Sequence, residues 1–244
     1  MYLHNEIIHN KVSASIILPN VFKLIKPNSI LDIGCGIGTW LSVAKDLGVQ
    51  EVLGVDGENV SPNLLAKYLE KNEFYPYNLS LPLDLGRKFD LCLCLEVAEH
   101  LPQEAAEALV GTLVCHSDVI LFSAAIPGQG GQNHLNEQWP EYWEKLFNHF
   151  NFVFFDIIRP LIWENNSVDF WYKQNLFLVV RKDSYFNFPE AFSSLSKIHP
   201  DLLKSKNCQI ERLEKRIISL TDGRVSWKIY FEIVKKKFKR FFLR

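Results

Sequence analysis

A short apolar run at residues 30–33 passes directly into a loop in which glycine stands at alternate positions, Gly34, Gly36 and Gly38. Glycine lets a backbone turn sharply from a strand into a helix and approach a ligand without a Cβ atom in the way. Asp56 ends the next predicted strand, where a carboxylate can accept bonds from both hydroxyls of a ribose. The segment therefore predicts a nucleotide-like ligand at the carboxyl end of a parallel strand.

Strand-like and helix-like segments alternate along most of the chain. This alternation predicts an α/β fold with a doubly wound, mostly parallel, seven-stranded sheet. The sixteen residues between the last two strands, 159–174, show no clear helical period, which leaves an antiparallel final pair open. The expected strands are 30–33, 51–55, 74–77, 89–95, 118–124, 152–158 and 175–181, and the expected helices are 13–26, 39–47, 63–71, 102–114 and 137–150.

The net charge of −1 conceals an asymmetry. Residues 224–244 hold eight Lys or Arg against one Glu, a net +7, so residues 1–223 carry 19 − 27 = −8. An acidic body argues against a nucleic-acid-binding core and directs attention to the basic tail.

The five cysteines are an odd number and stand at no metal-ligand spacing. Cys92 and Cys94 are interpreted as small buried side chains on one face of a strand. No signal peptide is recognisable, and no apolar run approaches the about 18 residues of a membrane span. These features predict a cytoplasmic protein with free thiols. No carboxylate and histidine spacing predicts a metal site.

A dinucleotide-binding dehydrogenase is the obvious rival for the glycine loop. Two details separate the two readings. The spacing here is G-x-G-x-G, whereas the dinucleotide fingerprint is G-x-G-x-x-G. Asp32, two positions before the first glycine, would repel a pyrophosphate but attract the ammonium and sulfonium of S-adenosylmethionine.

With this loop, residues 10–183 resemble a class I (Rossmann-like) methyltransferase, whose cofactor is S-adenosylmethionine. The family usually has an Asp-Leu pair beside the adenine, and asparagine at position 78 departs from that pattern. The resemblance implies a cofactor site made of Asp32, Gly34, Gly36 and Gly38 around the methionine part, Asp56 at the ribose, and Gly57, Asn78 and Leu79 near the adenine.

The strand end at residues 95–102 carries a second match to the family. The resemblance implies that Glu96 and Val97 pass beside the methyl donor. The Glu-His-Leu-Pro sequence at 99–102 is similar to small-molecule methyltransferases. The Asn/Asp-Pro-Pro-Tyr signature of amino-directed DNA enzymes is missing from this strand end.

The loop after the fifth strand predicts an acceptor site. Three glycines are followed by polar side chains and then by aromatic ones, a combination that suits a polyhydroxylated ligand such as a sugar. The alternative is that Asn136 only caps a helix whose buried face is aromatic. A second polar and aromatic cluster precedes the last strand, and it suits a pocket wall, a solvent-facing loop or a dimer contact. The predicted acceptor residues are Glu99, Gln132, Asn133, Asn136, Glu137, Trp139, Trp163 and Tyr172.

Methyl transfer to a hydroxyl requires alignment of the nucleophile and removal of its proton. Histidine suits the role of base near neutral pH. His100 and His134 follow two different strands whose ends face the cofactor. Both are therefore candidates for the catalytic base, and His134, which lies in the more unusual motif, is the first choice. The alternative role for His100 is to position the acceptor or the loop.

The alternation stops after residue 183, so we expect a methyltransferase domain over 1–183 and a helical extension over 184–244. Ile210, Leu213, Ile217 and Leu220 follow a coiled-coil-like spacing, which is compatible with a homodimer. Residues 224–244 predict a basic amphipathic helix that lies on an anionic membrane, at its inner face, or on an acidic partner. The acidic body of the same protein is the competing docking site.

Together these features predict an S-adenosylmethionine-dependent O-methyltransferase acting on a sugar hydroxyl in surface-polysaccharide or related glycan synthesis. A second reading is N- or O-methylation of another small metabolite. A third is a module that binds the cofactor and recruits partners without catalysis.

Overall fold

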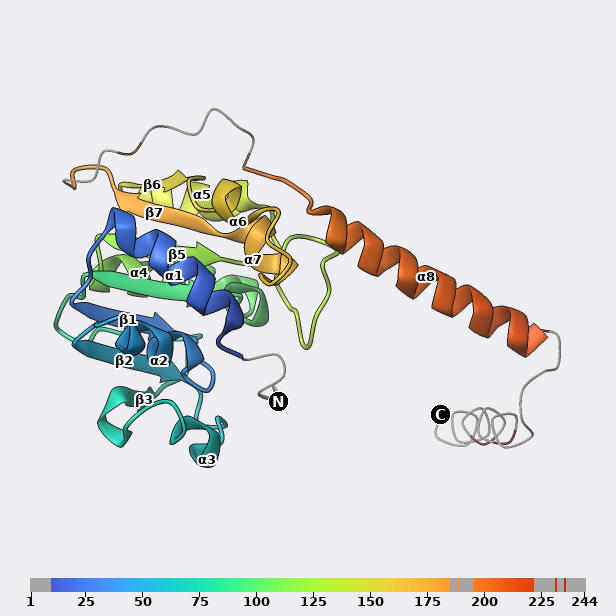
Figure 1. Cartoon of the computed structure of the whole chain (residues 1–244), viewed down its shortest axis with the longest axis horizontal. Coiled ribbons are helices and arrows are strands. Elements are labelled where there is room, and N and C mark those ends of the chain that lie inside the picture. The colour runs from blue at the N-terminus through green and yellow to red at the C-terminus, as the bar shows by residue number, and fades with distance from the viewer. Residues whose placement is uncertain (1–9, 185–187, 189–194, 222–230, 232–234, 236–244) are drawn as a thin grey trace. The chain divides into compact units, whose positions relative to one another are not determined.

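The computed structural model describes residues 10–184, 188, 195–221, 231 and 235 (Figure 1). The chain divides into two compact units, residues 1–199 and residues 200–244, and each is described here by itself. The sequence placed the boundary earlier, at residue 183, where the strands end. The first unit extends further because Arg159 binds the carbonyl of Leu195 and Gln174 binds the amide of His199.

A seven-stranded sheet organises the first unit, in the order β3-β2-β1-β4-β5-β7-β6. Strands β1 to β5 pair in parallel, and β7 runs antiparallel to both β5 and β6. The predicted fold class is confirmed, and the final pair is antiparallel. The strands are β1 Ser29–Ile33, β2 Glu51–Asp56, β3 Phe74–Pro76, β4 Leu91–Leu95, β5 Val119–Ser123, β6 Phe152–Phe155 and β7 Phe177–Arg181.

Helices cover both faces of this sheet (Figure 1). Helices α1 (Val12–Leu24) and α2 (Thr39–Asp46) pack on the face that carries Leu91 and Leu93. Helices α4 (Ala106–His116) and α5 (Pro140–His149) pack on the face that carries Cys92 and Cys94. Because both faces are covered, β4 is apolar at successive positions, and its two cysteines are buried free thiols as predicted.

Two predicted segments differ from the structure. The helix expected over 63–71 ends early, as α3 Pro62–Leu65. Leu69 lies instead beside the glycine loop, where a Cβ atom on Gly38 would stand 2.5 Å from Leu69 Cγ. Residues 159–174, which showed no helical period, form helix α6 (Arg159–Ile162) and most of helix α7 (Phe170–Asn175). Helices of four and six residues are too short to display a 3.6-residue period.

The second unit contains helix α8, Pro200–Thr221. The predicted apolar stripe lies on this helix, with Ile210, Leu213 and Ile217 all more than half exposed. Pairing of two copies through this face stays a prediction. The basic segment 224–244 lies outside the described residues, apart from positions 231 and 235. Within the part of the chain that the structure describes, no helix has the length and apolarity needed to cross a membrane.

Candidate active site

The glycine loop after β1 has the backbone conformation that its sequence predicted. Gly34, Gly36 and Gly38 have φ angles of 85°, 54° and 85°, which side chains of L residues rarely adopt. A Cβ atom on Gly34 would also lie 2.3 Å from Val97 Cγ2. Glycine is therefore required at the first position both by conformation and by the close approach of the β4 strand end.

Asp56 closes this loop from the end of β2. One carboxylate oxygen accepts a bond from the Gly36 amide at 2.7 Å, and the other accepts one from the Gly57 amide at 2.6 Å. Each oxygen has a second lone pair and can accept another hydrogen bond. The backbone thus holds the Asp56 carboxylate in a fixed position beside the glycine loop, at the end of β2.

Asp32 is the second carboxylate of this site and is only 3% exposed. Burial, and then the negative charge of Asp56, raise the pKa of Asp32 well above its ordinary value. A cationic ligand would relieve this unfavourable burial of a carboxylate. The site therefore fits a ligand with a positive charge near β1 and a ribose near β2, as S-adenosylmethionine has.

Asn78 and Leu79, predicted beside the adenine, follow β3 next to Asp56. The Tyr77 amide donates to the Asp56 carbonyl at 2.8 Å, which brings this segment to the mouth of the loop. The Asn78 side chain is exposed and accepts a bond from the Ser80 amide at 3.1 Å. Its predicted contact with the adenine stays a prediction.

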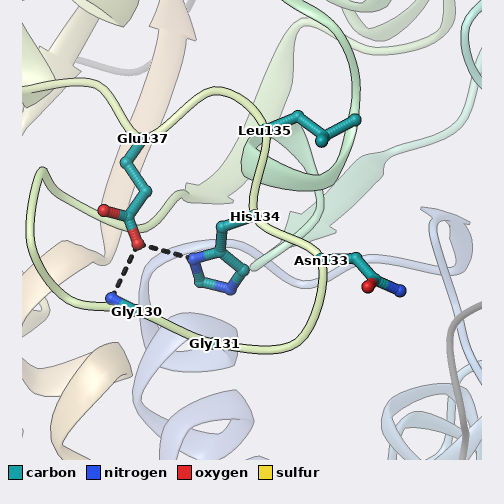
Figure 2. A pocket seen from close by; sticks show the side chains of 6 residues that line it. All are labelled: Gly130, Gly131, Asn133, His134, Leu135 and Glu137. Carbon is teal, nitrogen blue, oxygen red and sulfur yellow. Dashed lines mark hydrogen bonds and ion pairs between the residues drawn. The ribbon is translucent and has the colours of Figure 1, made fainter. Parts of the chain in front are cut away.

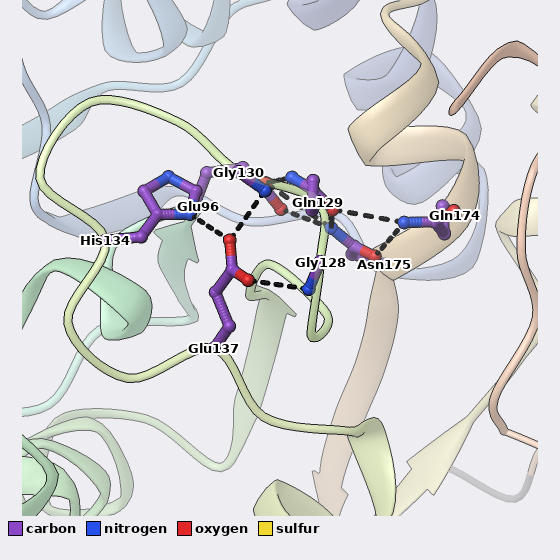
Figure 3. Close-up of polar contacts among 8 residues, drawn as sticks. All are labelled: Glu96, Gly128, Gln129, Gly130, His134, Glu137, Gln174 and Asn175. Atoms are coloured by element: carbon purple, nitrogen blue, oxygen red, sulfur yellow. Dashed lines mark hydrogen bonds and ion pairs between the residues drawn. The ribbon is translucent and has the colours of Figure 1, made fainter. Parts of the chain in front are cut away.

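Glu96, directly after β4, is the centre of a polar network (Figure 3). Its carboxylate accepts a bond from Gln129 at 2.9 Å and one from Asn175 at 3.1 Å. Asn175 and Gln174 both donate to the Gln129 side-chain oxygen. Burial raises the pKa of Glu96, although these donors oppose the shift. The network ties the ends of β4 and β5 to the start of β7.

Sequence reasoning did not single out Gln129 and Asn175 as site residues. Asn175 reaches the network because β7 is antiparallel, so that its first residues lie at the edge where the parallel strands end. The sequence does contain a signal for Asn175, because Gln174 and Asn175 directly precede an apolar strand. Side-chain amides that are buried beside such a strand need hydrogen-bond partners.

His134 lies in the loop after β5 and is held by a carboxylate. Its Nδ1 is 2.8 Å from Glu137 Oε1, and the same carboxylate accepts the amides of Gly128 and Gly130, each at 2.7 Å (Figure 2, Figure 3). These bonds hold the pKa of Glu137 below its ordinary value although its partial burial acts in the opposite direction. Glu137, predicted as an acceptor contact, therefore orients the histidine and closes its loop.

The second histidine comes from the loop after β4. The rings of His100 and His134 are 4.8 Å apart and meet edge to face. The two loops are joined by the Glu99 carbonyl, which accepts the Leu135 amide at 2.7 Å and the Asn136 amide at 3.0 Å. The fold thus brings together the two histidines that the sequence predicted at separate strand ends.

Glu99 is fully buried between these histidine loops. Both of its carboxylate oxygens are buried without a hydrogen-bond partner among the described residues. Burial, and then the charge of Glu96, raise the pKa of Glu99 well above its ordinary value. A carboxyl group that is hidden in this way does not fit the predicted role of an acceptor contact exposed to the pocket.

An open pocket of about 440 Å³ lies over the His134 loop (Figure 2). Asn133, predicted as an acceptor contact, lines it with a φ angle of 58°, which asparagine tolerates better than most residues. Its other lining residues are Gly130, Gly131, His134, Leu135 and Glu137.

The remaining predicted acceptor residues are more scattered. Gln132 is exposed, and Trp139 is 41% exposed at the start of α5. Asn136 is buried and does not cap α5, since its side-chain oxygen accepts a bond from Gln138. Trp163 packs on His199 with ring centres 4.6 Å apart.

Tyr172 lies closer to the cofactor loop. Its ring meets the ring of Trp40, in α2, at a centre-to-centre distance of 5.2 Å. Burial, and then the charge of Glu96, raise the pKa of Tyr172. Tyr172 therefore packs edge to face on α2, close enough to Glu96 for the charge of that carboxylate to affect it.

A family model described as a methyltransferase domain matches residues 5–153. This is more than half of the chain and includes the glycine loop, Asp56 and both histidines. The chain belongs to this methyltransferase family. S-adenosylmethionine fits the loop as the methyl donor, as the sequence predicted. No curated protein sequence matches the chain closely.

Solved structures with the same fold include sugar-modifying enzymes. An amino pentose methyltransferase from Micromonospora echinaspora is 14% identical and has a TM-score of 0.53. The alignment covers 74% of this chain and 99% of that one. A sugar N-methyltransferase from Streptoalloteichus sp ATCC 53650 is 15% identical, with a TM-score of 0.52 and coverage of 70% of this chain and 87% of that one. DesVI of Streptomyces venezuelae is 14% identical, with a TM-score of 0.51 and coverage of 73% and 99%. At these identities the likeness shows the shared fold.

Proposed function

We propose that the protein is an S-adenosylmethionine-dependent O-methyltransferase that acts on a hydroxyl of a sugar-type small molecule. The observation that carries this proposal is the His134–Glu137 pair, at 2.8 Å, in a loop at the carboxyl edge of the sheet where the cofactor loop also lies. Bound S-adenosylmethionine supplies an activated methyl group at that edge. The chain's own residues must then align the acceptor and remove its proton.

The histidine is arranged for proton removal. When Nδ1–H donates to Glu137, the other ring nitrogen is left as an acceptor. Bound S-adenosylmethionine would supply the methyl carbon to the acceptor oxygen, and His134 Nε2 would take the proton that the hydroxyl gives up. The carboxylate of Glu137 stabilises the imidazolium that results, as in other carboxylate-oriented histidine bases.

The sugar-type acceptor is supported by the lining of the pocket and by the structural neighbours. Asn133 lines the open pocket beside His134, and its side-chain amide is of a type that can both donate and accept hydrogen bonds. Two structural neighbours are named as a sugar N-methyltransferase and an amino pentose methyltransferase. Transfer to an amine is therefore the second candidate reaction, and a place in glycan synthesis remains part of the proposal.

A panel of acceptors tests the proposed function. Purified protein is incubated with S-adenosylmethionine and with nucleotide sugars that carry either hydroxyls alone or an amino group, and release of S-adenosylhomocysteine is measured. We expect turnover with at least one hydroxyl-only nucleotide sugar. Turnover restricted to amino sugars would replace O-methylation by N-methylation. Tight cofactor binding without turnover on any acceptor would support the non-catalytic module.

The basic segment 224–244 is proposed as a membrane or acidic-partner contact because of its net charge of +7 and its aromatic content. Deleting these residues is expected to abolish sedimentation with anionic liposomes and to leave turnover on a soluble acceptor unchanged. Neutral liposomes are the control. Failure of the intact protein to sediment with anionic liposomes would reject the membrane contact.

A further inference from the structure

We propose that Glu99, His100 and His134 form a binding site for a divalent first-row transition-metal cation, with Mn²⁺ as the probe of choice. The inference goes beyond methyl transfer, and it concerns binding of the cation itself. It rests on the geometry of the three side chains, on the burial of Glu99, and on the hydrogen bond that orients His134.

The three side chains come together from two loops. Each offers one ligand atom, and these atoms all lie within 4.8 Å of one another. Bonds of about 2.0–2.2 Å to a common cation place ligand atoms about 3.0–4.4 Å apart. Small side-chain rotations would therefore bring the three atoms onto one ion, without movement of the strands that carry the loops.

The Glu99 carboxylate is buried in this cluster without a hydrogen-bond partner among the described residues. The residue is 0% exposed. A buried carboxylate is expensive unless it is paired, protonated or coordinated to a metal. A cation between Glu99 and the two histidines would coordinate this buried carboxylate and offset the cost of its burial.

His134 is already oriented as a metal ligand usually is. Histidines that bind metals commonly donate the other ring N–H to a carboxylate, which fixes the tautomer and the ring direction. Glu137 occupies Nδ1 of His134 at 2.8 Å and is itself fixed by the amides of Gly128 and Gly130. Glu137 is therefore a positioning residue for the proposed site.

The ligand set indicates the kind of cation. Two imidazoles and one carboxylate on one side of an ion suit Mn²⁺, Fe²⁺, Co²⁺ or Zn²⁺ and leave positions open for other ligands. Mg²⁺ and Ca²⁺ prefer sites built from oxygen. A cation held here would change the role of His134 in the proposed reaction. His134 would hold the ion that lowers the pKa of the acceptor hydroxyl, instead of taking the proton of that hydroxyl itself. Metal binding is therefore tested before kinetics.

The test is direct binding of Mn²⁺ to full-length protein that has been treated with chelator and freed of any histidine tag. The electron paramagnetic resonance signal of free Mn²⁺ is titrated against protein, and bound metal is counted by mass spectrometry. We expect one ion per chain. Glu99→Gln and His134→Asn are each expected to weaken binding at least about 100-fold, and Glu137→Gln about 10- to 100-fold.

Matched controls separate the site from general surface binding. Glu104→Gln and His149→Ala change exposed residues of the same types and should bind Mn²⁺ as the wild type does. Unchanged affinity for S-adenosylmethionine shows that each variant is folded, and His134→Asn carries the test should Glu99→Gln fail to fold. Absence of Mn²⁺ binding, or binding that Glu99→Gln and His134→Asn leave unchanged, would overturn the proposal. Because no acceptor is needed, this result is independent of the proposed sugar methylation.

Discussion

Replacing His134 by alanine is expected to lower kcat at least tenfold while leaving the affinity for S-adenosylmethionine unchanged. A positioned base contributes about 10²–10⁴-fold to a proton-transfer step, and His134 is the residue that Glu137 orients for this task. The conformation of the glycine loop depends on Gly34, Gly36 and Asp56 and not on His134. The affinity for S-adenosylmethionine should therefore stay unchanged when turnover falls. The measurements are steady-state kinetics on the best acceptor and calorimetric titration with the cofactor.

Two further variants sharpen this result. His149→Ala removes an exposed histidine at the end of α5 and should retain wild-type turnover. Glu137→Gln keeps the shape of the side chain but removes its charge, so kcat should fall with little change in KM. Wild-type turnover in His134→Ala would remove this residue as the base and would leave His100 as the histidine to examine next.

Replacing Asp32 by asparagine is expected to weaken S-adenosylmethionine binding by about 10- to 150-fold, which corresponds to the loss of about 1.5–3 kcal/mol from a hydrogen bond to a charged group. Asp32 is buried near the end of β1, just before the glycine loop, where the ammonium of the cofactor would meet it. Calorimetric titration gives the change in affinity, and Asp46→Asn, an exposed carboxylate on α2, is the control. Wild-type affinity in Asp32→Asn would show that the cofactor's charge is recognised elsewhere.

The same variant should make the cofactor-free protein more stable at neutral pH. Burial and Asp56 raise the pKa of folded Asp32 above its unfolded value of about 3.9. The folded state therefore binds the proton more tightly, and stability falls as pH rises from the unfolded pKa through the folded one. Asp32→Asn lacks this loss, so its melting temperature should exceed that of the wild type at pH 7–8 and approach it near pH 4. A difference in melting temperature between variant and wild type that is the same at both pH values would contradict the argument that burial of Asp32 is unfavourable.

Local patterns were sufficient for the core of the fold. The run into Gly34, the apolar strand at 91–95 and the turn residues between elements are signals that operate over a few neighbours, and the structure places these elements within a few residues of the predicted bounds. Elements whose form depends on distant contacts were missed. Helices α6 and α7 are short, and α7 ends at the residues whose amides bind Glu96 and Gln129.

The sequence by itself determined the glycine loop and the proposed methyl-donor residues beside it, because glycines, Asp32 and Asp56 act through backbone conformation and charge that follow from residue type and spacing. Only the tertiary structure decided what surrounds Glu96 and His134. The antiparallel β7 brought Asn175 to Glu96, and the Glu99 carbonyl joined two loops so that His100 meets His134. These contacts join residues far apart in the chain, and neither periodicity nor spacing records which loops the sheet will place side by side.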